Sequence, residues 1–314
     1  MNDQKVKETQ SGVVSVIGRP NVGKSSLFNL ILKEDLSIVT EKAQTTRDNL
    51  KGLYNTKRGQ IIFLDTPGFH HAKEHGINAF MVQKASQAIQ EEKPDLIWYL
   101  IEPSRRLERQ APILKVLEKN CKTPVFLILN KIDLVEKDEN LRKNTEVFVS
   151  ELKEKLTSMQ VKFKEFSLSV NKKIGLQRIL DATWNFIPPG PIYYMDQEQL
   201  SDQPVKFFVA EKIRKTLFLE LSDEIPYSSL VQIENFHEKP TITVIDASII
   251  VERPSQKGIV IGDKGKMIKL IGQSARRDIE LFLNKKVFLN LNVRVIKNWT
   301  KDEQTLKRLG YSLN

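Results

Sequence analysis

The sequence predicts an α/β domain, with a mostly parallel sheet and flanking helices, followed by a smaller α+β domain. From Ser15 to about Ile187, short apolar runs alternate with longer amphipathic stretches, which is typical of β-α-β units. Residues 186–204 then hold four prolines among polar residues, which indicates a linker. Beyond the linker the strand-like segments are longer, and apolar residues alternate with polar ones within them. We therefore divide the 314 residues into three parts: a first domain at 1–187, a linker at 188–204 and a second domain at 205–314.

Each element follows from its pattern. Apolar runs predict five strands in the first domain: 13–17, 60–64, 95–101, 124–130 and 162–168. In the second domain, apolar residues recur on one helical face at 205–221 and 266–283, which predicts helices there. Alternating residues predict three strands: 228–236, 241–252 and 287–296. Thr300 and Glu303 have the spacing of a capping box, so we expect a short last helix that ends near Gly310.

Composition narrows the class of protein. The net charge is +10, and residues 253–297 hold eleven Lys and Arg against three Asp and Glu, a net charge of +8. Such a block favours nucleic acid or an anionic membrane surface as a partner. No apolar run is long enough to span a bilayer, and the polar N-terminus has no apolar signal core. Cys121 is the single cysteine, which excludes an internal disulfide and favours a reducing cytoplasm.

A phosphate-binding turn follows the first predicted strand. It reads G-x-x-x-x-G-K-S and consists of Gly18, Arg19, Pro20, Asn21, Val22, Gly23, Lys24 and Ser25, with Ser26 next in the helix that follows. Its glycines let main-chain N–H groups converge on phosphate oxygens, and the helix adds the positive end of its dipole. Lys24 can reach the β- and γ-phosphates, and the Ser25 hydroxyl can bind Mg²⁺.

A second motif ends the strand at 60–64. It consists of Asp65, Thr66, Pro67 and Gly68. A carboxylate at the carboxyl end of such a strand lies where ligands bind in these sheets. Asp65 can hold the metal through water, and the Gly68 N–H can contact a γ-phosphate.

A third motif selects the base. Asn130, Lys131 and Asp133 end the strand at 124–130. The Asp133 carboxylate can accept both donors on the N1/N2 edge of guanine, a pairing that adenine does not offer. Between the first two motifs, the polar stretch 40–49 can close on Mg²⁺ through a threonine hydroxyl and open after hydrolysis. The sequence thus predicts a guanine-nucleotide site.

A G-x-x-G loop lies inside the basic block. Gly262, Asp263, Lys264 and Gly265 separate two helical pieces, and Lys266 and Lys269 follow. Such a loop lets a nucleic-acid backbone approach without Cβ clashes, and the three lysines can meet phosphates. We expect single-stranded RNA binding here.

The three nucleotide-site motifs, which are the phosphate-binding turn, Asp65 to Gly68 and Asn130 to Asp133, resemble those of GTPases related to translation factors. The resemblance assigns Gln44 to Asp48 to the second family motif, with Thr45 and Thr46 near the nucleotide and Thr46 as the Mg²⁺ ligand. It makes Ser169 the best candidate in the fifth motif, although Val170 stands where an alanine is usual. Phe69 replaces the glutamine that many GTPases use to orient water. The chain thus resembles the subclass without that glutamine, in which an asparagine placed like Asn21 helps hold K⁺ and intrinsic hydrolysis is slow. The implied catalytic residues are Lys24, Asp65, Gly68 and Asn21.

Over nearly the whole chain, this order of a GTPase and a type II KH domain resembles the Era family. The resemblance rests on GRPNVGKS, AQTTRD, DTPG, NKID, YSSLVQIENF, IVERPSQKGIVIGDKG and the ending WTKDEQTLKRLGY. It implies GTP and GDP with Mg²⁺, binding to the 3′ end of 16S rRNA, and a role in 30S subunit assembly. It also implies a monomer in the cytoplasm with peripheral contact with the inner membrane. Two alternatives stay open: a GTPase whose basic domain docks on anionic lipid, and a tRNA-modification-type GTPase.

Overall fold

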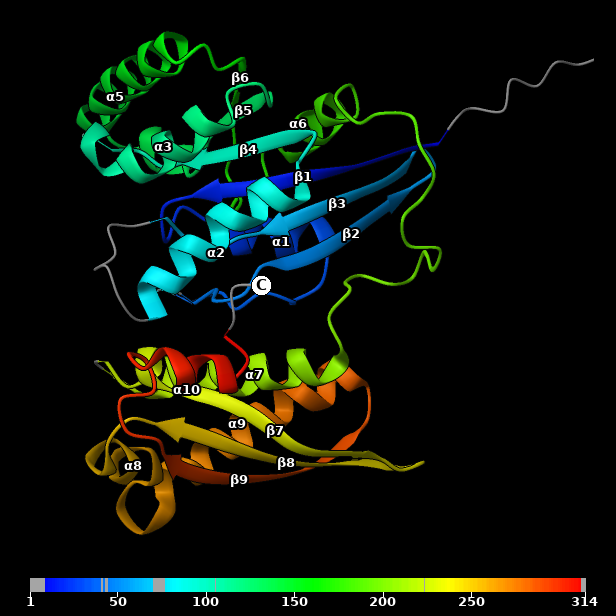
Figure 1. Cartoon of the computed structure of the whole chain (residues 1–314), viewed down its shortest axis with the longest axis vertical. Coiled ribbons are helices and arrows are strands. Elements are labelled where there is room, and N and C mark those ends of the chain that lie inside the picture. The colour runs from blue at the N-terminus through cyan, green and yellow to red at the C-terminus, as the bar shows by residue number, and fades with distance from the viewer. Residues whose placement is uncertain are drawn as a thin grey trace, which may run out of the picture. The chain divides into compact units, whose positions relative to one another are not determined.

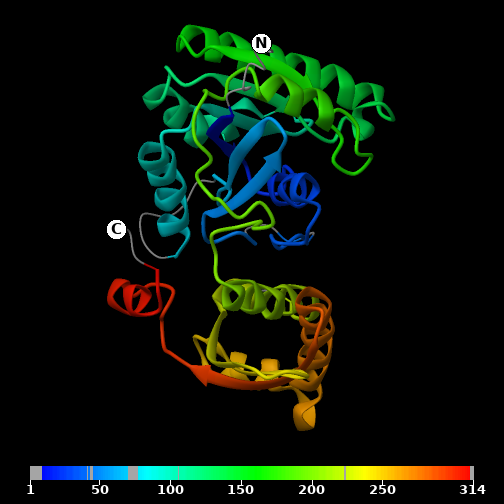
Figure 2. The same ribbon diagram turned by 90° about the vertical axis from the view of Figure 1, so that its right-hand side faces the viewer.

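The computed structural model describes residues 9–40, 42, 45–69, 77–104, 106–222 and 224–311. The chain divides into two compact units. The first unit comprises the described residues of Met1–Ser37, Thr46–Ala72 and Met81–Asp202. The second comprises those of Ile38–Thr45, Lys73–Phe80 and Gln203–Asn314. Figures 1 and 2 show the two units from perpendicular directions.

A six-stranded sheet forms the centre of the first unit, in the order β2-β3-β1-β4-β5-β6. Its strands are β1 (Gln10–Gly18), β2 (Leu50–Thr56), β3 (Gly59–Asp65), β4 (Leu96–Ile101), β5 (Val125–Leu129) and β6 (Phe163–Ser167). Every neighbouring pair is parallel except β2 and β3, which are antiparallel. The predicted mostly parallel sheet is therefore confirmed.

Strand β2 was not expected from the sequence. Its residues LKGLYNT have no continuous apolar run, because β2 is an edge strand that needs only one well-packed face. Residues from the expected linker lie beside it. The Leu53 N–H donates to the Leu200 carbonyl at 2.9 Å, and Tyr194 packs on the cluster that contains Leu53 and Ile62.

Helices flank this sheet on both faces (Figure 1). They are α1 (Lys24–Leu32), α2 (Ile77–Glu92), α3 (Ala111–Lys119), α4 (Ile132–Val135), α5 (Glu139–Ser158) and α6 (Leu176–Thr183), with a short 3-10 helix at Leu107–Gln110. Residues of α2, α3 and α5 share one core with β4 and β5, which includes Ile89, Leu117 and Leu152. The apolar strands are buried because helices cover both faces of the sheet.

The second unit is built on a three-stranded sheet in the order β7-β8-β9. Its elements are α7 (Val205–Glu220), β7 (Leu230–Glu238), β8 (Ile242–Val251), α8 (Pro254–Ile261), α9 (Lys266–Leu283), β9 (Lys286–Val295) and α10 (Glu303–Arg308), with 3-10 turns at Pro226–Ser228 and Asp263–Gly265. Helices α7 and α9 pack side by side (Figure 2), and with α8 they cover one face of the sheet through Ile213, Val260 and Ile271. The sequence-based helix–strand–strand–helix–helix–strand order is confirmed.

The expected capping box at the last helix is wrong. Asp302, not Thr300, is the N-cap of α10, and its side chain accepts a hydrogen bond from the Thr305 N–H at 2.8 Å. The Thr300 hydroxyl instead donates to the Glu252 carboxylate. Asp302 caps the helix because aspartate is at least as good an N-cap residue as threonine and lies directly before the first helical turn.

In the part of the chain that the structure describes, no helix is both long enough and apolar enough to cross a membrane.

Candidate nucleotide site and nucleic-acid interface

The phosphate-binding turn joins the end of β1 to the start of α1. Gly23 precedes α1 with a left-handed main chain (φ 99°), and Asn21 also has a positive φ of 64°. A Cβ atom at Gly23 would lie 2.4 Å from Asn130 Nδ2. Glycine is therefore required here for two reasons, its main-chain angle and the closeness of Asn130.

Lys24 lies under this turn. Its side chain is buried, and Nζ donates to the carbonyls of Arg19 at 3.0 Å and Gly18 at 3.2 Å. Burial lowers the pKa of Lys24 to about 8, although the negative charges of Asp65 and Glu102 oppose that shift. An anionic phosphate beside Nζ would favour the charged form of the amine, so the position suits a phosphate contact.

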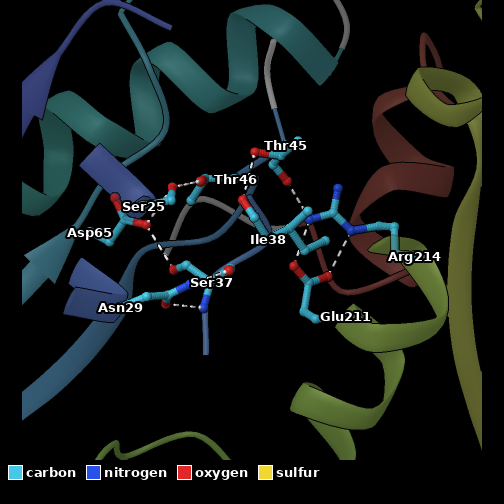
Figure 3. A network of polar contacts seen from close by, with 9 residues as sticks. All are labelled: Ser25, Asn29, Ser37, Ile38, Thr45, Thr46, Asp65, Glu211 and Arg214. Atoms are coloured by element: carbon cyan, nitrogen blue, oxygen red, sulfur yellow. Dashed lines mark hydrogen bonds and ion pairs between the residues drawn. The ribbon is translucent and has the colours of Figure 1, made fainter. Parts of the chain in front are cut away.

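Three oxygen-bearing side chains, those of Ser25, Thr46 and Asp65, meet at the start of α1 (Figure 3). The Ser25 hydroxyl donates to Asp65 Oδ2 at 3.0 Å and is hydrogen-bonded to the Thr46 hydroxyl at 2.9 Å. Asp65 is fully buried, and burial raises the pKa of its carboxyl group, whereas Lys24 and the hydrogen bonds from Ser37 and Ser25 lower it. Asp65 Oδ1 has no hydrogen-bond partner among the described residues. Hydroxyl and carboxylate oxygens around one orphaned buried oxygen are a donor set that fits Mg²⁺.

The residues after Asp65 approach the phosphate-binding turn. A Cβ atom at Gly68 would lie 2.8 Å from the main-chain nitrogen of Pro20, so only glycine permits this contact. The Thr66 hydroxyl donates to the Val16 carbonyl at 2.9 Å, and Pro67 is buried beside it. The Phe69 N–H donates to the Gly18 carbonyl at 3.1 Å, and the Phe69 ring is buried in the core. An apolar buried ring cannot orient a water molecule.

The base-selecting motif lies at the ends of β5 and β6. Asn130 is buried; its Nδ2 donates to the Val22 carbonyl at 2.8 Å, and its Oδ1 accepts from the Val170 N–H at 3.1 Å. The Ser169 hydroxyl donates to Asp133 Oδ1. These contacts bring three separate motifs together around one cavity.

That cavity has a volume of about 470 Å³ and is lined by Gly23, Ser26, Asn130, Lys131, Asp133, Leu134, Val170 and Asn171. The predicted members of this set thus lie around one space, with the Asp133 carboxylate at its wall. Lys131 has a left-handed main chain (φ 61°) and forms an ion pair with Glu102.

The polar stretch 40–49 is described in part. Thr46 faces Ser25, whereas the Thr45 hydroxyl donates to the Ile38 carbonyl at 3.0 Å. The two neighbouring threonines therefore point to different partners, and Thr46 is the one at the metal-type site. Gln44, which the resemblance places in the second motif, lies outside the described residues.

In the second unit, the G-x-x-G loop is a sharp turn between α8 and α9. Gly262, Lys264 and Gly265 all have positive φ angles, of 71°, 48° and 78°. A Cβ atom at Gly262 would lie 2.6 Å from Met267 Cβ, whereas one at Gly265 would meet open space. Gly262 is thus required by packing, and Gly265 leaves its main chain open to an approaching ligand.

The lysines around this loop face solvent. Lys264, Lys266 and Lys269 are exposed, and Lys266 forms an exposed ion pair with Asp263 at 3.0 Å. An exposed pair of this kind is weak, so a phosphate can compete for the ammonium group.

A hollow of about 330 Å³ lies between α9 and β9 in the same unit. It is lined by Ile268, Lys269, Gly272, Gln273, Arg276, Phe288, Leu289 and Leu291. Arg276 and Gln273 offer hydrogen-bond donors, and the exposed Phe288 ring offers a face for stacking. Both the cationic and the aromatic components of a single-strand RNA surface are present.

Both units match known protein families. A family model described as a 50S ribosome-binding GTPase matches residues 13–131, and a KH domain model matches residues 224–300. GTPase Era of Geobacter metallireducens is 42% identical over 306 residues, which is 96% of this chain and 98% of that protein. The chain belongs to the Era family of GTPases.

Solved Era structures extend the likeness to three dimensions. A variant of Aquifex aeolicus Era bound to GDP·AlF4⁻ is 31% identical with a TM-score of 0.86, over 97% of this chain and all of the other. An Era structure in complex with MgGDPNP and nucleotides 1506–1542 of 16S ribosomal RNA is 32% identical with a TM-score of 0.85 over the same shares. The predicted family and fold class are confirmed, and as an Era-family member the chain is a GTP-hydrolysing enzyme.

Sequence reasoning missed several residues of this Era-family chain. In the hollow of the second unit, Gln273 and Arg276 follow Lys269 at i+4 and i+7, so helical spacing could have placed them on the same face. In the first unit, the Ser37 hydroxyl donates to Asp65, and Asn29 accepts from the Ser37 N–H, yet neither residue belongs to a recognisable motif.

Proposed function

We propose that this GTPase binds Mg·GTP, hydrolyses it to GDP and phosphate, and binds the 3′ end of small-subunit ribosomal RNA through its KH domain during 30S assembly. One observation carries the proposal: a guanine-type cavity with a metal-type donor set lies in the first unit, and a basic G-x-x-G surface lies in the second. The Era relative that was solved with MgGDPNP and a 16S rRNA segment supports it.

Each residue has a role in this proposal. Ser25 and Thr46 ligate Mg²⁺, and Asp65 holds a water on the metal. Lys24 and the main chain of the phosphate-binding turn neutralise the phosphates, and the Gly68 N–H contacts the γ-phosphate. Phosphoryl transfer relies on such positioning and charge stabilisation. Because Phe69 is buried, no side chain at that position orients the attacking water, which favours slow intrinsic hydrolysis.

We further propose that Asn21 helps hold K⁺ beside the phosphates. Asn21 is exposed at the tip of the turn, with the left-handed main chain described above. A monovalent cation there would supply positive charge where it develops on the bridging oxygen.

We place the protein in the cytoplasm, with peripheral contact with the inner membrane, and expect it to be a monomer. The single cysteine supports a reducing compartment, and the basic block at 253–297 supports contact with an anionic membrane surface. A separate lipid surface would be indicated if anionic vesicles bound a variant that had lost its RNA affinity.

The experiment compares RNA and nucleotide binding in one variant. Changing Lys264 and Gly265 to Asp should abolish binding to a 3′-terminal 16S rRNA oligonucleotide and leave GDP affinity intact. The matched control changes charge equally outside the basic block, with Lys301→Asp combined with Lys307→Ala, both exposed. Wild-type RNA affinity should fall steeply with salt, because phosphate contacts release counterions. Unchanged RNA affinity in the loop variant would refute the assignment of the G-x-x-G loop to RNA binding.

A further inference from the structure

Helix α1 brings two functional side chains to one face. Ser25 and Asn29 are four residues apart, so they lie one helical turn from each other. Ser25 contacts Asp65 directly, as described above. Asn29 contacts the segment that follows the helix, at residues 35–37 (Figure 3).

Asn29 fixes Ser37 from both sides of its main chain. Asn29 Oδ1 accepts from the Ser37 N–H at 2.8 Å and from the Leu36 N–H at 3.2 Å. Asn29 Nδ2 donates to the Ser37 carbonyl at 2.9 Å and to Asp35 Oδ1 at 2.8 Å. A side chain whose own main chain is held at both ends has little freedom of position.

Ser37 in turn holds Asp65. The Ser37 side chain is buried, and its hydroxyl donates to Asp65 Oδ2 at 2.9 Å. The same oxygen accepts from Ser25 at 3.0 Å, while Oδ1 stays without a partner among the described residues. Two hydroxyl donors on Oδ2 fix the rotation of the carboxylate and leave Oδ1 as its open oxygen.

The chemistry of the donor matters as much as its position. A lysine or arginine at position 37 would neutralise Asp65 and compete with a divalent cation for its charge. A neutral hydroxyl orients the carboxylate and leaves its full negative charge for the metal. Ser37 therefore combines orientation with retention of charge.

We propose that Ser37, clamped by Asn29, is a positioning residue that presents Asp65 Oδ1 to the hydration shell of Mg²⁺. The inference rests on the assignment of Ser25 and Asp65 to the metal site proposed above. It predicts that the Ser37 hydroxyl acts on the coupling between Mg²⁺ and nucleotide, rather than on nucleotide binding as such.

The experiment measures the equilibrium affinity of the full chain for fluorescent GDP across a Mg²⁺ titration and in EDTA. Ser37→Ala should raise the Mg²⁺ concentration for half-maximal tightening about tenfold, as loss of an outer-shell partner typically does. The affinity in EDTA should stay at the wild-type value. Ser37→Thr, which keeps the hydroxyl, should restore the Mg²⁺ response, and Asn29→Ala should weaken it.

The matched control is Ser15→Ala. Ser15 is fully buried in β1, and its hydroxyl has no hydrogen-bond partner among the described residues, so the same atom is deleted from the same unit without touching Asp65. This control should keep the wild-type Mg²⁺ response. Ser25→Ala is the reference for the metal assignment and should lose it.

The outcomes distinguish an error in the metal-site assignment from an error in the role of Ser37. If Ser25→Ala kept its Mg²⁺ response, the proposed metal site itself would be wrong. If Ser25→Ala lost the response and Ser37→Ala kept it, the positioning role of Ser37 would be refuted alone. An equal loss of affinity with and without Mg²⁺ in Ser37→Ala would also refute that role, because it would indicate a merely structural hydrogen bond.

Discussion

Asn130 offers the sharpest test of how the nucleotide site is held together. Its amide joins the phosphate-binding turn, through Val22, to the loop after β6, through Val170. Asn130→Ala removes both hydrogen bonds and keeps the main-chain bond from the Asn130 N–H to the Ile101 carbonyl. The variant therefore isolates the side-chain cross-link.

The magnitude follows from the two bonds and their burial. Each is worth about 0.5–1.5 kcal/mol net, and the Val22 carbonyl is left without its donor in a buried position. We expect a loss of about 2–3 kcal/mol in the free energy of unfolding, a large share of the ~5–15 kcal/mol that keeps a typical domain folded. GDP affinity should also fall, because the turn and the base-selecting loop are no longer aligned.

The assay is a urea titration of the nucleotide-free protein, followed by circular dichroism, together with a GDP titration of each variant. Asn120→Ala is the control, because its Nδ2 makes one partly buried bond to the Val116 carbonyl at 2.8 Å, one turn back along the chain at the end of α3. It should cost about 1 kcal/mol at most and leave GDP affinity unchanged. If Asn130→Ala cost no more than Asn120→Ala and kept full GDP affinity, the cross-link would not hold the site.

Three further predictions follow from the same structure. Asp133→Asn should lower GTP affinity and raise affinity for xanthosine nucleotides, because the donor–acceptor pattern at the base edge is inverted; competition titrations measure it, and equal binding of ATP and GTP by the wild type would contradict the guanine assignment. K⁺ should accelerate single-turnover GTP hydrolysis relative to Na⁺ at equal ionic strength, and Asn21→Ala should abolish that difference; equal wild-type rates in both salts would refute the cation model. Asp302→Ala should lower the free energy of unfolding through loss of the α10 cap; a urea titration measures it, and no change would show that the cap contributes nothing to stability.

The sequence was most informative where a motif and its surroundings obey one local rule. The phosphate-binding turn could be predicted because glycine spacing, a buried strand before it and a helix after it are all local features. The strands β4 and β5 could be predicted because burial on both faces requires continuous apolar runs. Strand β2 could not be predicted, because an edge strand does not need a continuous apolar run. Its sequence, LKGLYNT, mixes apolar residues with glycine and polar residues.

Local rules also misled in one place. Thr300 and Glu303 have the right spacing for a capping box, but Asp302 lies closer to the helix and takes the Thr305 N–H. Thr300 is then used for a contact with Glu252, 48 residues earlier in the chain. A spacing rule cannot weigh such a competing long-range partner.

The same limit explains why the support of Asp65 was not predicted. Asp65 was expected to hold a metal from its position after a buried strand. In the structure its carboxylate accepts from the Ser25 hydroxyl, which is also hydrogen-bonded to the Thr46 hydroxyl. Its second donor, Ser37, is 28 residues away, and Asn29 reaches Ser37 only because α1 presents both Ser25 and Asn29 on one face. Residues that touch a ligand must satisfy its chemistry and therefore recur as motifs. Residues that orient them must satisfy only the geometry of one fold, so they are found when the fold is known.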